Sequence, residues 1–410
     1  MSLKLGIFQF RGCSKCFDET LLLNKYEIVR IPEPATWKEE KFNVAIITGY
    51  LLEDDKNIIE KISANSDRVI AFGSCTTTGG IFGLNYQRGV KVMPLKLLHS
   101  SITEVAGCLG EIDTLEETIE NKLSTRVKNL CETCNRKSTC DYLEEVHRQI
   151  EFGDGEEQCF NDLGFMCAGY VAKECKERCI DFGAPCRACK PSVERSGWRQ
   201  MALFATLMGN IEVATEATGK GGTDKLADAD DDITEANPDV TGNYFRFTLA
   251  DSQMPMGRLK SSGNLNTDLY LGRPIEELPL IMGCCGGKSA ISLTLDSIEA
   301  LEKGIEMEIQ PKTTEVRIKL RSLEQDLIKA IESQDGSAYS SVCDSIRSIA
   351  GNMNLSNIFF GGFKTPIKGE DDFDSYKYQV FEPQAGTFQH GKIQYSLDQK
   401  GIITEFKMEA

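Results

Sequence analysis

The stretch KLGIFQF at residues 4–10, followed at once by RGCSKC at residues 11–16, decides the fold of this chain. Apolar residues alternate along the first part, which is typical of a β-strand, and a Cys-x-x-Cys pair comes directly after it. Further strand-like runs lie at 44–48, 69–72 and 92–94, and a stretch with isoleucines at helical spacing lies at 55–63. Strands that alternate with amphipathic helices predict an α/β fold with a doubly wound parallel sheet.

Thirteen of the sixteen cysteines lie between Cys13 and Cys189, in two groups of different build. The members of the first group follow predicted strands and are Cys13, Cys16, Cys75 and Cys108. Ligand sites in such sheets lie at the carboxyl ends of the strands, so we expect these four side chains to converge there. The second group is dense and comprises Cys131, Cys134, Cys140, Cys159, Cys167, Cys175, Cys179, Cys186 and Cys189. Because a [4Fe–4S] cluster takes four thiolates, the two groups predict three clusters and a role in electron transfer.

Composition narrows the class of protein. The net charge of −16 argues against binding to nucleic acid or to an anionic membrane surface, and no apolar run approaches the length of a spanning helix. The first residues lack the pattern of a secretion signal, so we expect a cytoplasmic protein whose thiols stay reduced. With only three histidines, a His-rich catalytic metal site within this chain is not expected.

The chain divides into four predicted segments. Residues 1–125 carry the sheet and the first cysteine group, and residues 126–200 carry the dense group with few apolar runs. A segment of that kind needs metal to hold its shape. Residues 201–260 include a Gly- and Asp-rich linker at about 216–240. Residues 261–410 form an extension, with a predicted helix over 292–334 and predicted strands at 376–381, 392–397 and 402–406.

Four motifs, in order along roughly residues 4–250, resemble the small, electron-transferring subunit of [NiFe] hydrogenases. More specifically, the chain resembles the gamma-type subunits of cytoplasmic archaeal enzymes that reduce a deazaflavin coenzyme or feed a heterodisulfide reductase, as in methanogenesis. The motifs are Gly12-Cys13-x-x-Cys16, Gly73-Ser74-Cys75 with Gly79-Gly80, Gly107-Cys108, and the later series Cys131, Cys134, Cys159, Gly164-Phe165-Met166-Cys167, Cys175, Cys179, Cys186 and Cys189.

The resemblance implies a flavodoxin-like domain with a proximal cluster on the first four cysteines, followed by a ferredoxin-like module with two further [4Fe–4S] clusters. It implies a catalytic large subunit as one partner and a flavin-containing or heterodisulfide-reductase-type subunit as the other, with no catalytic centre in this chain. Asp18 stands where the family often has a carboxylate near the proton path. A solvated acid at a helix start is the alternative for Asp18.

The chain departs from the family pattern at three places. Lys15 replaces a glycine within the first Cys-x-x-Cys pair, Leu109-Gly110 replaces two prolines, and Asn135 replaces one proline. These changes leave every expected ligand in place but alter the surface expected to face a catalytic partner. A partner whose large subunit has lost nickel is therefore an alternative, and a zinc-rich scaffold protein is a more distant one.

Several cysteines have no fixed assignment. Cys140 is either a spare thiol or a ligand in place of Cys159, and the division of the later eight cysteines between two clusters stays open because such modules often cross-ligate. Cys284, Cys285 and Cys343 lie outside the resemblance and are expected to be buried small side chains, with a regulatory thiol or a partial metal site as the alternative. The extension is expected either to dock a partner or to pack on its own chain.

Overall fold

The computed structural model describes residues 3–122, 128–138, 147–151, 157–191, 239–252 and 259–409. Cys140 lies outside these residues, as does the predicted linker of 216–240 apart from its last two positions. The predicted boundaries near residues 126, 200 and 260 also fall at or within the parts that are not described, so the four-segment division stays a prediction.

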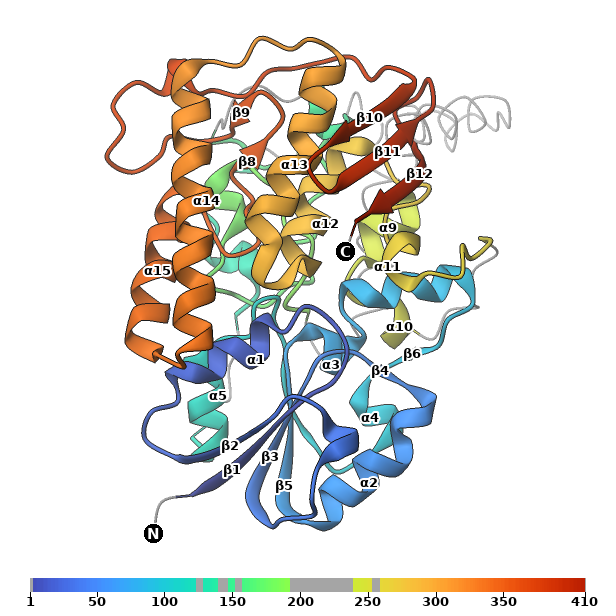
Figure 1. Ribbon diagram of the computed structural model, residues 1–410, viewed down its shortest axis with the longest axis vertical. Coiled ribbons are helices and arrows are strands. Elements are labelled where there is room, and N and C mark those ends of the chain that lie inside the picture. The colour runs from blue at the N-terminus through green and yellow to red at the C-terminus, as the bar shows by residue number, and fades with distance from the viewer. Residues whose placement is uncertain are drawn as a thin grey trace.

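A five-stranded parallel sheet forms the first part of the chain, in blue at the bottom of Figure 1. Its strands are β1 (Lys4–Gln9), β2 (Glu27–Ile31), β3 (Phe42–Thr48), β5 (Ser66–Phe72) and β7 (Thr103–Val105). The strand order β2-β1-β3-β5-β7 reverses direction next to β1, as in flavodoxin-like doubly wound folds, and all four pairings are parallel. The predicted α/β parallel sheet is therefore confirmed.

Helices cover both faces of this sheet. The helices are α1 (Lys15–Glu19), α2 (Lys56–Ala64), α3 (Ser74–Thr78), α4 (Leu95–Leu98) and α5 (Ile112–Ile119). Successive strand residues point to opposite faces, so Phe8 packs with α2 and α4 while Ile7 packs with α1 and α5. The central strands β1, β3 and β5 are buried on both faces and mainly apolar, which is why the sequence shows them clearly.

Three elements of this domain differ from expectation. The sequence did not indicate β2, a partly exposed edge strand with charged residues, or β7, which is only three residues long. The predicted strand at 92–94 lies outside the parallel sheet. This segment forms β6 (Val92–Met93), which pairs antiparallel with β4 (Leu51–Leu52) in a separate two-stranded sheet.

The described residues from 239 onward are mainly helical and end in a small sheet, above the parallel sheet in Figure 1. The helices of this part are α9 (Val240–Phe245), α10 (Leu249–Ser252), α11 (Leu265–Asp268), α12 (Leu278–Cys285), α13 (Ala290–Gly304), α14 (Pro311–Glu332) and α15 (Gly336–Ala350). Its strands are β8 (Ile358–Phe359), β9 (Gly362–Phe363), β10 (Gly386–His390), β11 (Ile393–Leu397) and β12 (Ile403–Met408). The predicted strands at 392–397 and 402–406 correspond to β11 and β12.

Two predictions in this extension are wrong. The single helix expected over 292–334 is two helices, because the chain turns at Glu306 with a φ of 54° and restarts at Pro311, a residue suited to the first helical position. The strand expected at 376–381 is absent from the described residues, where only Lys377 forms an isolated bridge. Its alternating aromatics pack instead against aromatic residues near β8 and β9, as in the pair of Phe360 and Phe381 with ring centres 5.0 Å apart.

The cysteine-dense segment shares one hydrophobic core with the extension. Leu130, Phe160 and Ile180 are buried in the same apolar cluster as Ile281 and Ile346. This segment has few apolar runs of its own, and the extension supplies the apolar partner for its buried residues. The extension packs on its own chain over this large area, and a role in docking another subunit stays a prediction.

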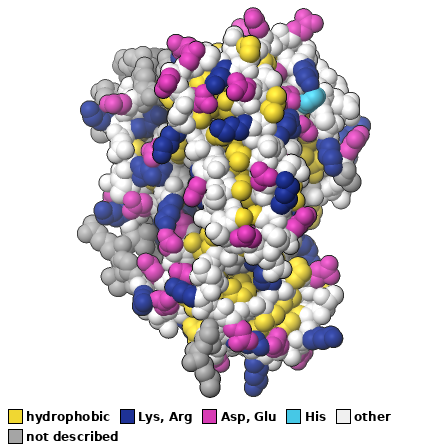
Figure 2. Space-filling model, turned by 60° about the vertical axis from the view of Figure 1, so that its left-hand side comes forward, with side chains coloured by type: hydrophobic (Ala, Val, Ile, Leu, Met, Phe, Trp, Pro, Cys, Tyr) yellow, Lys and Arg dark blue, Asp and Glu magenta, His cyan; other side chains and the backbone are white. Residues whose placement is uncertain are grey.

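Charged side chains of both signs are interspersed over the face drawn in Figure 2. Single apolar side chains reach the surface at separate places, such as Ile318 on α14, which is 64% exposed. Within the described ranges, no helix combines the length and the apolar character that crossing a membrane requires.

A buried ion pair joins α13 to α14 and yields a test of the packing. Arg317 Nη1 and Nη2 lie 2.6 and 2.7 Å from the two carboxylate oxygens of Glu302. We predict that Glu302→Ala lowers the free energy of unfolding by about 3–5 kcal/mol, because it leaves the Arg317 charge buried without its partner. Urea unfolding followed by circular dichroism measures this.

The control is Asp326→Ala on the same helix α14, which breaks the exposed pair of Asp326 with Lys329. An exposed pair contributes little, so this variant should stay within about 0.5 kcal/mol of the wild type. Equal effects of the two variants would contradict the packing described for Glu302.

Candidate functional site

Four cysteines converge at the carboxyl edge of the parallel sheet. Cys13 and Cys16 follow β1, Cys75 lies in α3 directly after β5, and Cys108 follows β7. Burial, together with the neighbouring Cys108, raises the pKa of Cys13 to about 11. Burial also raises the pKa of Cys75, as do the nearby Cys13, Cys108 and Cys16. The predicted convergence is therefore confirmed, and we call these four residues the first cysteine site.

Glycines let the backbone pass close to these sulfurs. A Cβ at Gly73, whose φ is 93°, would lie 2.6 Å from the Sγ of Cys16. A Cβ at Gly80, whose φ is 54°, would lie 2.8 Å from the Sγ of Cys75. Both positions therefore require glycine for space and for backbone conformation.

Backbone N–H groups also point at the sulfurs. The N–H of Lys15 donates to Cys13 and lowers its pKa, against the larger effect of burial. The N–H of Gly110 donates to Cys16 and acts in the same direction, again against burial. Amide donors of this kind stabilise negative charge on sulfur, as they do around iron–sulfur clusters.

The later eight cysteines separate into two consecutive sets of four. Burial, together with the neighbouring Cys167, Cys134 and Cys159, raises the pKa of Cys131 to about 12. Gly169 contacts two members of this set, since a Cβ there would lie 3.1 Å from the Sγ of Cys131 and 3.7 Å from that of Cys167. We call Cys131, Cys134, Cys159 and Cys167 the third cysteine site.

The other set surrounds a cavity. Cys175, Cys179, Cys186 and Cys189 all line it, and we call them the second cysteine site. Burial, together with the neighbouring Cys179, raises the pKa of Cys175 to about 12. Arg187 and Lys364 also line the cavity, so basic side chains stand beside these thiols. Burial, with the neighbouring Arg187, lowers the pKa of Lys364 to about 7.

Direct contacts connect the three sites in a row. The Sγ of Cys189 lies 3.5 Å from the carbonyl oxygen of Cys108, which joins the second site to the first. The backbone N–H of Cys186 donates to the Sγ of Cys167 at 3.3 Å, which joins the second site to the third. Sequence order therefore differs from spatial order, because the last four cysteines lie between the other two sets.

This donor chemistry fits iron–sulfur clusters. Neighbouring thiols in the buried sites raise one another's pKa, so four thiolates there need a compensating cation. Thiolates select soft metals and iron–sulfur clusters. The glycine cradle and the amide donors at the first site, and the cavity at the second, suit a bulky inorganic group that takes four thiolates.

Carboxylates beside the first site are buried. Asp18 is 5% exposed, burial raises its pKa to about 6, and Arg30 lies 3.8 Å away. The alternative of a solvated acid at Asp18 is therefore wrong, and a role in proton transfer stays a prediction. Glu19 accepts a hydrogen bond of 2.9 Å from the Tyr339 hydroxyl of the extension.

The extension contributes groups that sequence reasoning missed. Cys284 lines the cavity of the second site and hydrogen-bonds with Cys108 of the first. Cys285 lies near Cys13 and contacts the Tyr270 hydroxyl at 3.1 Å. The adjacency of Cys284 and Cys285 was the only sequence signal, while Cys343 is a buried side chain near Tyr339, as expected.

The departures from the family pattern have a structural reason at Lys15. Its side chain is buried and donates to the carbonyl oxygens of Gly283 and Met353, both in the extension. Leu109 is also buried within the chain, and only Asn135 is exposed. The expectation that Lys15 and Leu109 belong to a partner-facing surface is therefore wrong.

Comparison with known proteins finds relatives that match parts of this chain. A family profile described as "NADH ubiquinone oxidoreductase, 20 Kd subunit" matches residues 11–121. A subunit of the F420-non-reducing vhu hydrogenase of Methanocaldococcus jannaschii is 27% identical over 244 residues, which cover 48% of this chain and 84% of that protein. The corresponding subunit of the F420-non-reducing hydrogenase of Methanothermobacter marburgensis is 23% identical over 323 residues, which cover 64% of this chain and 98% of that protein.

Among solved structures, the oxidized [NiFeSe] hydrogenase of Desulfovibrio vulgaris Hildenborough matches with a TM-score of 0.34. The identity is 14%, and the match covers 48% of this chain and 96% of that chain. The family profile and the two archaeal relatives agree with the motifs around the first cysteine site. The chain is therefore similar to the small subunits of hydrogenases, which are subunits of oxidoreductases.

Proposed function

We propose that this chain is the electron-transfer subunit of a hydrogenase-type complex and holds one [4Fe–4S] cluster at each of its three cysteine sites. The row of three four-cysteine sites is the observation that carries this proposal. Clusters of this type accept and donate single electrons. The chain itself supplies the thiolates, the amide donors to sulfur and the burial that together set a cluster's reduction potential.

The route of electrons follows from the contacts between sites. An electron at the first site passes to the second through the contact of Cys108 with Cys189, and then to the third through the contact of Cys186 with Cys167. Cys131 of the third site is exposed, and Tyr170 close to this site is 56% exposed. The third site is therefore the end of the row at which an external partner exchanges electrons.

The partners are proposed from the relatives and from the resemblance. A large subunit with the bimetallic centre carries out the hydrogen chemistry, and the three cysteine sites of this chain carry the electrons. A flavin-containing or heterodisulfide-reductase-type subunit exchanges electrons at the third site. The complex is proposed to be cytoplasmic.

One observation favours a second candidate, in which the large subunit lacks nickel. Lys15 and Glu19, which flank the Cys16 loop, contact the chain's own extension and not an open surface. Elemental analysis of the complex purified from its native source separates the candidates. Nickel in proportion to this chain supports the hydrogenase, and a complete complex without nickel supports the second candidate.

We predict about twelve iron atoms and twelve acid-labile sulfides per chain in protein prepared without oxygen, because three sets of four cysteines each fit one cluster. Iron and sulfide assays with parallel zinc analysis measure this. About eight irons would remove one cluster from the proposal. Zinc in place of iron would overturn it in favour of the scaffold alternative.

We predict that Cys75→Ser removes or converts the cluster at the first site and leaves the other two, because the proposed ligands that raise the pKa of Cys75 all belong to the first set. Low-temperature EPR of the reduced protein resolves the three signals. The matched variant Cys140→Ser should leave all three signals in place, since Cys140 is the spare thiol in this scheme. Joint loss of all signals in folded Cys75→Ser protein would contradict the division into separate sites.

A further inference from the structure

Cys284, at the end of α12, stands between the first two cysteine sites. It is 1% exposed and lines the cavity of the second site. Its thiol hydrogen-bonds with Cys108. A cysteine that ligates a cluster is a thiolate without a proton, so Cys284 is then the donor and the Cys108 sulfur the acceptor.

The loop after α15 reaches the same two sites from the other side. The Nδ2 of Asn352 lies 3.2 Å from the Sγ of Cys179, in the second site. The Nδ2 of Asn354 donates to the carbonyl oxygen of Cys108, in the first site. Alternate residues of one loop thus contact cysteines of two different sites.

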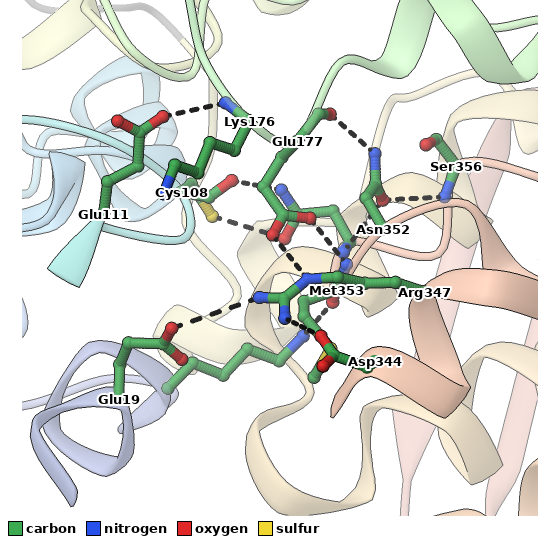
Figure 3. Close-up of polar contacts among 12 residues, drawn as sticks. Glu19, Cys108, Glu111, Lys176, Glu177, Asp344, Arg347, Asn352, Met353 and Ser356 are labelled. Carbon is green, nitrogen blue, oxygen red and sulfur yellow. Dashed lines mark hydrogen bonds and ion pairs between the residues drawn. The ribbon is translucent and has the colours of Figure 1, made fainter. Parts of the chain in front are cut away.

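Buried polar contacts hold Cys284 and the loop after α15 in place. Glu177, which lies between Cys175 and Cys179 in sequence, accepts hydrogen bonds from Arg347 Nε at 3.0 Å and from the Met353 N–H at 2.8 Å (Figure 3). The Lys15 ammonium donates to Gly283 O beside Cys284 and to Met353 O beside Asn352. The end of α12 and the loop after α15 are therefore fixed to each other and to the loops that carry the cysteines.

We propose that Cys284 and Asn352 of the C-terminal extension form a hydrogen-bonding bridge that sets the reduction potentials of the first and second sites. This inference rests on the proposed function. The two residues are positioning residues, because each acts through a cysteine ligand. They lie outside the motifs that the family shares, so the device belongs to the extension.

The physical reason is the charge on sulfur. A donor that points at a ligand sulfur stabilises the more negative, reduced state, and so raises the reduction potential. Such a hydrogen bond is stronger in a buried, low-dielectric site than in water. Cys284 donates to the first site and Asn352 to the second, so each donor acts on a different cluster.

The first test uses Cys284→Ala and Cys284→Ser in the full chain, with EPR-monitored redox titration. We expect Cys284→Ala to move the midpoint potential of one signal, the one that Cys75→Ser removes, to a more negative value without loss of iron. Cys284→Ser retains a donor and should restore most of the shift. The control Cys343→Ser changes another buried cysteine of the extension, which contacts Tyr339 and no proposed ligand, and should leave all potentials unchanged.

The second test uses Asn352→Leu, which removes the amide at similar volume. We expect the signal of the second site to move to a more negative potential while the iron content stays constant. The control Asn357→Leu changes a buried asparagine of the same loop that donates to Ile349 O and Thr365 O and to no sulfur. It should lower stability without moving a potential.

The outcomes separate this inference from the proposed function. Unmoved potentials in Cys284→Ala and Asn352→Leu, with iron intact, overturn the bridge and leave the proposed function standing. Loss of a whole cluster in Cys284→Ala also overturns it, because Cys284 would then be a ligand. Equal shifts of the potentials in the control variants would mean that any disturbance of the packing moves the potentials, which would also overturn the bridge. Wild-type protein without iron would overturn the proposed function itself.

Discussion

Mutual repulsion among buried thiolates is the constraint on which the rest of this structure depends. Burial holds the pKa of Cys13 and Cys175 well above the ordinary value, and the neighbouring Cys108 and Cys179 raise these pKa values further. Adjacent sets of such sulfurs are compatible with a folded chain only where cations, amide dipoles and basic side chains offset their charge. Three features meet this requirement. They are the glycines with positive φ at the first site, the N–H groups that donate to sulfur, and the positions of Arg187 and Lys364 beside the second site.

The sequence predicted the parts of the fold in which local pattern and burial agree. Strands such as β1, β3 and β5 are buried on both faces and are therefore apolar throughout, and the cysteines of the first site follow strand ends, so their convergence could be inferred. Short or half-exposed strands such as β7 and β2 leave too weak a pattern. The alternation at 376–381 misled because aromatic side chains of a loop were buried by tertiary packing, which periodicity does not distinguish from a strand.

The division of the later cysteines could not be predicted, because spacing alone does not specify which loop folds back on which. The contribution of the extension was equally hidden. Cys284 and Asn352 lie more than a hundred and fifty residues beyond the cysteines they contact, and their side chains carry no motif. Lys15 is instructive in this respect, since a departure from the family pattern near the first site has its partners, Gly283 and Met353, in the added segment.

The position of the extension constrains the order of events in biosynthesis. Cys284 and the loop of Asn352 seal the first two sites from the side, yet a ribosome completes them only after every proposed ligand has been made. The nascent chain therefore passes through a stage in which its ligands are accessible and the sealing segment is absent.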